Sequence, residues 1–196
     1  MLNIHSIPLG MLQTNCYILT QDGSRSCVVI DPGQMPQPLL AYLQQEGLTV
    51  EAILLTHGHF DHVGGVRTLV VETDAPVYLN EADLSLPPQM TDGPLYYTNS
   101  YAEGSELTLA GISFRVISTP GHTPGSVCLI TGDCMFSGDT LFAGSCGRTD
   151  FPGGSTEAML SSLHRLAGLQ GDLRVYPGHG ESTTLEREKK YNPYMK

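Results

Sequence analysis

Short apolar runs, separated by polar breaks that contain glycine, follow one another along the chain. Runs rich in valine, isoleucine and leucine that end at such breaks are typical of strands, and two runs joined by a glycine turn predict a hairpin. The strands expected on this basis are 14–20 and 26–31, which the turn pair Asp22-Gly23 separates, 51–56, a hairpin over 106–119 with its turn at Ala110-Gly111, a hairpin over 126–139 with its turn at Gly132-Asp133, and a last strand in 173–180.

Helical spacing of apolar residues occurs in other segments. Leu39, Leu40 and Leu43 have this spacing in the first of them. Ser155 precedes another segment as a candidate N-cap, and Glu157 lies in its first turn, where a carboxylate is favourable. The expected helices are 36–46, 63 to about 71, 155–167 and 183–190.

Residues 80–104 interrupt this alternation, because Pro87, Pro88 and Pro94 break any periodicity there. We expect a long irregular loop, which either lies over a binding site or only covers one face of a sheet. Strands and helices alternate elsewhere, with antiparallel hairpins among them, which favours a layered α/β fold with mixed sheets. A chain of 196 residues is long enough for one hydrophobic core and short for two, so one domain over 1–196 is expected.

The charge balance is acidic, since 20 Asp and Glu against 10 Lys and Arg give a formal net charge of −10. Proteins that bind nucleic acids present a basic face, so the expected partner is a small molecule rather than DNA or RNA. The five cysteines form no CxxC pair, which suits a reducing compartment. The N-terminus lacks the pattern of a signal peptide and no stretch has membrane-spanning length, so a cytoplasmic protein without membrane contact is expected. The sequence indicates no oligomeric state.

Histidines and aspartates gather where apolar runs end. His57 and His59 are two apart, so in extended backbone they point to the same side and can hold one cation together, while Asp61 and His62 remain for a second. The other candidates are His122 in TPGHTPGS, Asp139 in FSGDT and His179 in YPGHG. Imidazole and carboxylate suit zinc and similar metals, and seven such groups are too many for one ion. The pattern therefore predicts a two-metal site.

The motifs THGHFDHVGG, TPGHTPGS, FSGDTLF and YPGHG together resemble the metallo-β-lactamase superfamily, and most closely its glyoxalase II branch (hydroxyacylglutathione hydrolases). The resemblance implies a four-layer αβ/βα sandwich with the site at one edge, between two sheets. It also implies two divalent metal ions, for which zinc is the default, while iron or manganese would satisfy the same ligands. The implied ligands are His57, His59 and His122 for the first metal, Asp61, His62 and His179 for the second, and Asp139 as the bridge.

Such a site supports hydrolysis. Two cations roughly 3.5–4 Å apart lower the pKa of a shared water, and the bridging hydroxide attacks a carbonyl that one metal polarises. Asp61 is the expected catalytic residue, because it can both ligate and steer the attacking hydroxide. A thiol ionises at about pH 8.5, so a thiolate leaves without a dedicated acid. The expected reaction is cleavage of a small thioester of the S-(hydroxyacyl)glutathione type.

Candidate substrate contacts lie in two segments. Arg148, in GSCGRTDFPGG, matches a basic residue that holds glutathione in glyoxalase II, although Asp150 stands where that family has an aromatic residue. An ion pair between Arg148 and a nearby carboxylate is the alternative. The longer glyoxalase II enzymes have a further C-terminal helical region, and this sequence ends without it. Lys189, Lys190 and Tyr191 are therefore candidates to replace some of its contacts with an anionic substrate.

Other functions of the same metal ligands stay open. Persulfide dioxygenases of the superfamily share CGRTDF but bind a single iron through two histidines and an aspartate. The same hydroxide also suits another activated ester or a lactone, and a metal-binding protein without activity is a third class. The β-lactamase branch is disfavoured because it lacks the bridging aspartate, and the RNA-processing branch because it needs a basic surface.

Overall fold

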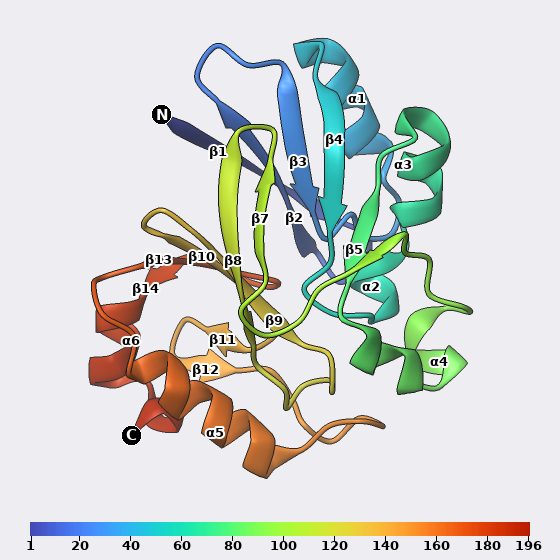
Figure 1. Cartoon of the computed structure of the whole chain (residues 1–196). Coiled ribbons are helices and arrows are strands. Elements are labelled where there is room, and N and C mark those ends of the chain that lie inside the picture. Colours follow the sequence, from blue (N-terminus) through green and yellow to red (C-terminus); the bar gives the residue numbers. More distant parts are fainter.

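Two six-stranded sheets face each other in the computed structural model, which describes residues 1–196 (Figure 1). In the first sheet the strands lie in chain order: β1 (Leu2–Leu9), β2 (Thr14–Gln21), β3 (Ser26–Ile30), β4 (Thr49–Leu54), β5 (Val77–Leu79) and β6 (Asn99–Ser100). In the second sheet the spatial order is β14 (Thr183–Thr184), β13 (Arg174–Pro177), β10 (Cys134–Gly138), β9 (Val127–Thr131), β8 (Ile112–Ser118) and β7 (Glu106–Leu109). A two-stranded ribbon of β11 (Leu141–Phe142) and β12 (Ser145–Cys146) follows β10.

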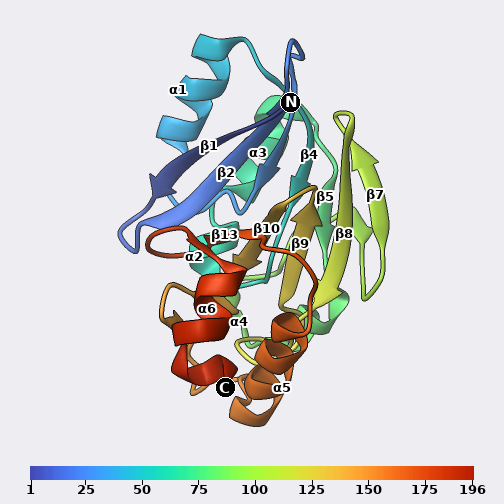
Figure 2. The same ribbon diagram turned by 90° about the vertical axis from the view of Figure 1, so that its left-hand side faces the viewer.

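Helices cover the outer faces of both sheets (Figure 2). The α-helices are α1 (Gln37–Glu46), α2 (Phe60–Val63), α3 (Val66–Thr73), α4 (Pro88–Thr91), α5 (Thr156–Ala167) and α6 (Leu185–Tyr191), and the 3-10 helices are η1 (Glu81–Ser85) and η2 (Pro193–Met195). The expected N-cap is present, since the Ser155 hydroxyl accepts from the Ala158 amide, and Gly47 ends α1 in the left-handed region with φ 62°. None of these helices is long and apolar enough to cross a membrane.

The hydrophobic core divides into three clusters, one for each interface between layers. The first lies between α1 and α3 and the first sheet, with Leu39 and Leu69 among its members. The second lies between the two sheets, and the third between the second sheet and helices α5 and α6. Three apolar interfaces separate four layers, so the αβ/βα sandwich of the metallo-β-lactamase fold is confirmed.

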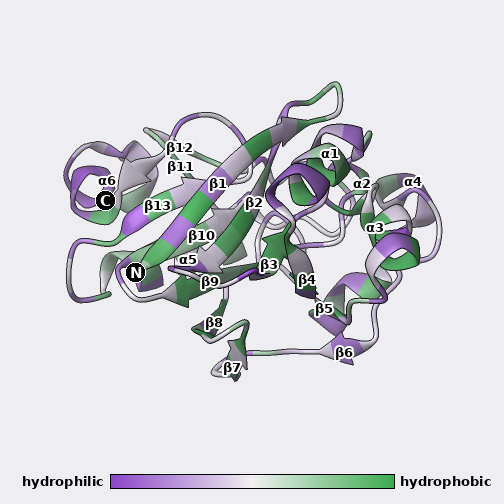
Figure 3. Cartoon of the chain, turned by 90° about the horizontal axis from the view of Figure 1, so that it is seen from above, coloured by the Kyte–Doolittle hydropathy of each residue, from purple (hydrophilic) through white to green (hydrophobic).

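The sequence pattern located most of these elements. The hairpin turns at 110–111 and 132–133 are confirmed, as are the two strands on either side of the turn at 22–23. The helix expected from 63 to about 71 is present as α3 but begins at Val66, and the short helix α2 before it was not expected; between the two, Gly64 and Gly65 pass close to the 32–34 backbone. Strand β1 was missed: its exposed positions carry polar side chains such as His5, so its apolar residues alternate instead of forming a run (Figure 3).

The irregular loop expected over 80–104 is partly ordered. It contains η1, α4 and β6, and its tyrosines pack inward, with the Tyr101 hydroxyl donating to the Leu55 carbonyl. The segment both covers a sheet face and lies over a cleft. Leu95 packs on the first core cluster, and Met90 lines the cleft next to the metal-ligand candidates.

Candidate metal centre

The metal-ligand candidates lie at one edge of the two sheets, in the segments that follow strands; Asp61 and His62 are in the short helix α2 and the others are on loops. His57, His59, Asp61 and His62 follow β4, His122 is in the loop between β8 and β9, Asp139 follows β10, and His179 follows β13. The turn after β10 depends on Gly138, whose φ of +48° suits glycine and whose side would meet Thr56 if it carried a Cβ. Because β10 pairs with both β9 and β13, the adjoining ends of these three strands bring His122, Asp139 and His179 close together.

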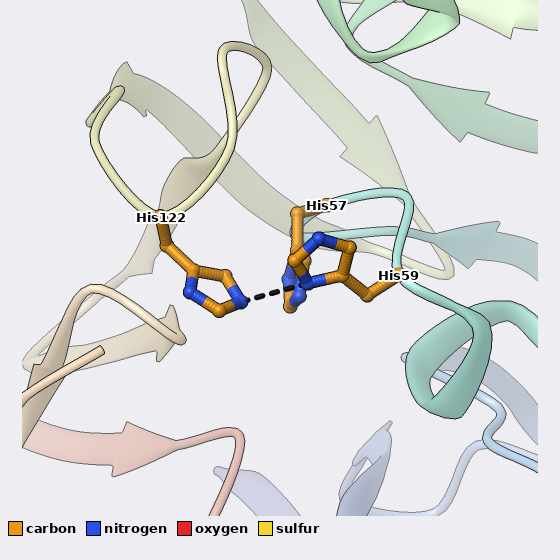
Figure 4. A group of neighbouring side chains, drawn as sticks. All are labelled: His57, His59 and His122. Carbon is orange, nitrogen blue, oxygen red and sulfur yellow. Dashed lines mark hydrogen bonds between the residues drawn. The ribbon is translucent and has the colours of Figure 1, made fainter. Parts of the chain in front are cut away.

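His57, His59 and His122 form the first group of three. One nitrogen of each ring lies within 4.8 Å of the other two, and all three residues are buried. Nδ1 of His59 is 2.8 Å from Nε2 of His122, although the two residues come from different loops (Figure 4). The edge-to-face arrangement of the three rings turns them toward one point rather than stacking them.

Asp61, His62 and His179 form the second group. Nε2 of His179 is 3.1 Å from Oδ2 of Asp61, and Nε2 of His62 is 3.5 Å from the same oxygen. The two imidazoles approach to 3.4 Å, Nε2 to Nε2. Asp61 and His62 lie in the short helix α2, and the ring centre of His62 is 4.1 Å from that of His57, so the second group adjoins the first.

Asp139 lies between the two groups. Its Oδ2 is 3.4 Å from Nε2 of His122 in the first group and 3.6 Å from Nε2 of His179 in the second, and its Oδ1 is 3.4 Å from Nε2 of His62. A carboxylate with oxygens near both groups is the arrangement needed to bridge two cations, which is the role that the family resemblance implies for this residue.

Hydrogen bonds to the outer nitrogens decide which lone pairs face the centre. Nδ1 of His122 is 2.7 Å from the Arg148 carbonyl oxygen, and Nδ1 of His179 is 3.2 Å from that of Leu12. A carbonyl only accepts, so both Nδ1 atoms carry a proton, and in the neutral form of each ring Nε2 is then the nitrogen with a free lone pair for a metal. Nδ1 of His62 is likewise held by Asp31, at 2.9 Å.

Three ligand candidates have a buried polar atom without a hydrogen-bond partner: Nε2 of His57, Nε2 of His59 and Oδ1 of Asp139. Two of these atoms face the centre, namely Oδ1 of Asp139 and Nε2 of His57, whose Nδ1 lies beside the Thr56 hydroxyl. His59, by contrast, turns its Nδ1 and not its Nε2 toward His122. A Cβ at Gly178 would overlap Asp139 and lie 2.6 Å from Cε1 of His62, so only glycine lets the backbone pass behind these ligands. Imidazole nitrogens and carboxylate oxygens that face one centre are the donor set that two divalent cations prefer, so the residues present fit the metals that the motifs imply.

The two groups differ in protonation before a metal binds. Burial, reinforced by the neighbouring histidines, lowers the pKa of His57 and takes the pKa of His59 to about 4, so both rings are neutral at physiological pH. Burial raises the pKa of Asp139, but His62, His122 and His179 together lower it by more, so the net pKa lies below the usual value. Burial likewise lowers the pKa of His62, but Asp139 and Asp31 raise it further, so without a cation a proton remains between these carboxylates.

Sequence reasoning missed the residues that hold the ligands in place. Asp31, with a left-handed φ of 51°, accepts from the Thr56 amide at 2.8 Å and its hydroxyl at 2.6 Å, besides holding His62. Thr14 donates to Oδ2 of Asp61 at 2.9 Å. The only sequence signals were an aspartate at a strand end in Asp31-Pro32-Gly33 and a threonine that begins an apolar run, and neither is specific.

A cleft of about 590 Å³ opens over the metal centre, a volume suited to a small organic molecule. A hollow of about 500 Å³ between β1, β2 and α1 contains none of the metal-ligand candidates, so the chemistry rather than the size identifies the cleft. Five candidates, namely His59, Asp61, His122, Asp139 and His179, are exposed to this cleft, and Arg148 lies on its wall.

The predicted substrate contacts separate into two cases. Arg148 lines the cleft, and the ion pair that was its alternative interpretation is also present, with Asp150 as the partner. Lys189, Lys190 and Tyr191 do not line the cleft; the Lys189 ammonium is held by the Leu169 carbonyl and Glu186, and Lys190 lies over the ring of Tyr191. Their contact with substrate stays a prediction that this geometry does not support.

The opposite face of helix α6 contacts the ribbon of β11 and β12. The buried carboxylate of Glu188 accepts from the Gly144 amide at 2.8 Å, and the Asn192 amide donates to the Ser145 carbonyl at 2.9 Å. These bonds hold the ribbon of β11 and β12, whose Phe142 forms part of the cleft wall. The C-terminal segment therefore supports the cleft wall from behind.

Replacing Thr14 by the similarly shaped valine is expected to weaken the second metal site about tenfold, because Asp61 loses the donor that orients its carboxylate. Competition with a chromophoric chelator measures both metal affinities. Thr108→Val, at an exposed position on β7, is the control. Equal affinities in wild type and Thr14→Val would show that this hydrogen bond does not orient Asp61.

Comparisons with known proteins agree with the geometry. A model of the metallo-beta-lactamase superfamily matches residues 9–179. Hydroxyacylglutathione hydrolase GloC of Haemophilus influenzae is 35% identical over 215 residues, which cover 99% of this chain and 98% of GloC. Among solved structures, TTHA1623 in a di-iron-bound form is 43% identical with a TM-score of 0.84 (97% of this chain and 99% of that one), and BLEG-1 B3 metallo-beta-lactamase is 38% identical with a TM-score of 0.89 (100% and 99%). The chain belongs to the metallo-β-lactamase superfamily of metal-dependent hydrolases.

Proposed function

We propose that this protein is a thioesterase that binds two divalent metal ions and hydrolyses a small thioester of the hydroxyacylglutathione type. The observation that carries the proposal is Asp139, whose two oxygens lie near both groups of ligands and so provide for two metals rather than one. The full-length similarity to hydroxyacylglutathione hydrolase GloC supports the substrate class.

The candidate ligands and the residues around them would have separate roles in the reaction. His57, His59 and His122 would hold one metal, Asp61, His62 and His179 the other, and Asp139 both. When bound, the two cations supply a Lewis acid for the substrate carbonyl and lower the pKa of a water molecule. Asp61 lines the cleft and accepts from Thr14, which fixes its carboxylate beside the reacting atoms.

The overall reaction consumes one water: the C–S bond breaks, a C–O bond forms, and the products are a carboxylate, a thiol and one proton. The cleft contains no lysine, tyrosine or further carboxylate that would serve as a general acid for the leaving group. A thiolate needs none near neutral pH, whereas an alkoxide or an amine does, and this favours a thioester over an ordinary ester or amide.

Metal analysis of the purified protein, paired with hydrolysis of S-D-lactoylglutathione on the same sample, tests the proposal. We expect close to two metals per chain, zinc by default, and turnover that collapses in Asp61→Asn. One iron per chain, with oxygen uptake in the presence of glutathione persulfide and no hydrolysis, would replace the proposal by a dioxygenase. Turnover of a lactone or of nitrocefin in place of every thioester would keep the hydrolase and reject the substrate class.

A further inference from the structure

His179 follows a strand of the second sheet, whereas the other two candidate ligands of its metal follow a strand of the first. Asp61 and His62 are neighbours on α2, after β4. His179 comes after β13, in a turn formed by residues 177–180. Its side chain is 27% exposed, against 11% for Asp61 and 0% for His62. His179 is therefore the least enclosed ligand of the three.

The turn that carries His179 has little support from its own sheet. The Gly178 amide donates to the Gly138 carbonyl at 2.8 Å, which is the only backbone hydrogen bond between the turn and the second sheet beyond the end of β13. Glycines lie on both sides of the histidine, and Gly180 has a φ of +78°. A backbone of this kind is free to adopt many conformations, so it needs contacts from outside to keep His179 in one place.

Asn15, at the start of β2 in the first sheet, makes these contacts. Its side-chain Nδ2 donates to the carbonyl oxygens of Pro177 and Gly180, both at 3.0 Å. Its backbone amide donates to the Gly178 carbonyl at 2.8 Å. Three of the four carbonyl groups of the turn thus accept hydrogen bonds from this one residue, on both sides of His179.

The place of Asn15 in the sheet leaves its backbone amide free for this bond. Strand β2 pairs with β3 from Tyr17 onward, so Asn15 lies beyond the last pair and has no strand partner on that side. The side chain also fits, because an asparagine amide has two N–H donors on one nitrogen and two carbonyls are to be held. An aspartate would present only acceptors to these carbonyls, and a serine or threonine a single donor.

We propose that Asn15 is a positioning residue of the second metal site, which holds the turn of His179 so that Nε2 of this histidine faces the other ligands. The distances at the site agree, since Nε2 of His179 is 3.1 Å from Oδ2 of Asp61 and 3.4 Å from Nε2 of His62. Nδ1 of the same ring is held by the carbonyl of Leu12, three residues before Asn15. The first sheet therefore holds both the backbone and the ring of a ligand that the second sheet supplies. The inference rests on the two metal ions of the proposed function but not on its substrate.

Metal affinity in a double-mutant cycle tests the inference without requiring turnover. Asn15→Leu keeps the shape of the side chain and removes both donors, and His179→Ala removes the ligand. We expect Asn15→Leu to weaken the second zinc ion about tenfold, the lower end of the range for losing a group that orients a ligand, and to leave the first unchanged. In the His179→Ala background the same substitution should have no further effect, because no histidine is left to position. Competition with chelators of graded strength measures both affinities down to the millimolar range.

Asn3→Leu is the matched control, since Asn3 is an exposed asparagine on β1 whose amide donates to Asp22, and it should alter neither affinity. An unchanged second affinity in Asn15→Leu would overturn the inference. Equal losses in the wild-type and His179→Ala backgrounds would also overturn it, because they would show that Asn15 only stabilises the fold. A wild type that binds one metal, and binds it as tightly after His179→Ala, would reject the two-metal function as well. Failure of all thioester hydrolysis, with the cycle as expected, would reject the proposed substrate alone.

Discussion

Replacing Asp139 by asparagine is expected to lower kcat/KM for the thioester on the order of 10³-fold, the size found when a group that stabilises transition-state charge is removed. The new side chain would be isosteric, but it presents an uncharged amide where one oxygen lies near His122 and His179 and the other near His62. The amide nitrogen cannot ligate a cation, so the link between the two groups is lost. We expect the metal content to fall below two per chain in the same variant.

Metal analysis and steady-state kinetics on one preparation measure both effects. Asp74→Asn is the matched control, because Asp74 is an exposed aspartate at the end of α3 that does not line the cleft. Unaltered thermal unfolding of the apo form would show that Asp139→Asn acts on the metals and not on the fold. An enzyme that kept two metals and most of its turnover would contradict the bridging role.

The fold could be predicted wherever local sequence determines local structure. The hairpin over 106–119 has its turn at Ala110-Gly111 because Gly111, at φ 72°, accepts a conformation that few residues adopt, and the strands on either side alternate in burial. Strand β1 could not be found in this way, since it is stabilised mainly by its pairing with β2 along eight residues and not by an apolar run. The order of the segment 80–104 likewise depends on packing against the first core cluster.

The grouping of the candidate ligands could be predicted from the sequence, whereas the residues that hydrogen-bond to them could not. Four ligands lie within six residues of sequence, and each of the others follows a strand at a glycine turn, so their residue types and spacing carry the signal. Asp31 is 31 residues from His62 in the chain, and the two meet only because β3 and β4 pair in parallel. Arg148 contributes its backbone carbonyl to His122, an interaction that no side-chain pattern can reveal.

Asp83→Asn is expected to weaken the first metal site by about 10–100-fold, the effect typical of losing a group that orients a ligand. Asp83, fully buried on η1, accepts from the amide of Gly58, from the amide of Gly125 and from the hydroxyl of Thr123, at 2.6–3.0 Å. Gly58 separates His57 from His59, and Thr123 follows His122, so this one carboxylate ties together the two loops that supply all three ligands of that site.

An asparagine in this place has one acceptor oxygen and turns an NH₂ group toward a donor. A buried donor without an acceptor costs about 1–3 kcal/mol, so the Tm of the apo protein should also fall by several degrees. Glu81→Gln, an exposed change on the same 3-10 helix, is the control and should alter neither quantity. The decisive comparison is between the two metal sites: a lower Tm with equal loss at both sites would mean that Asp83 only stabilises the fold. Loss confined to the site of His57, His59 and His122 would show that a residue outside the motifs sets the geometry of the first metal.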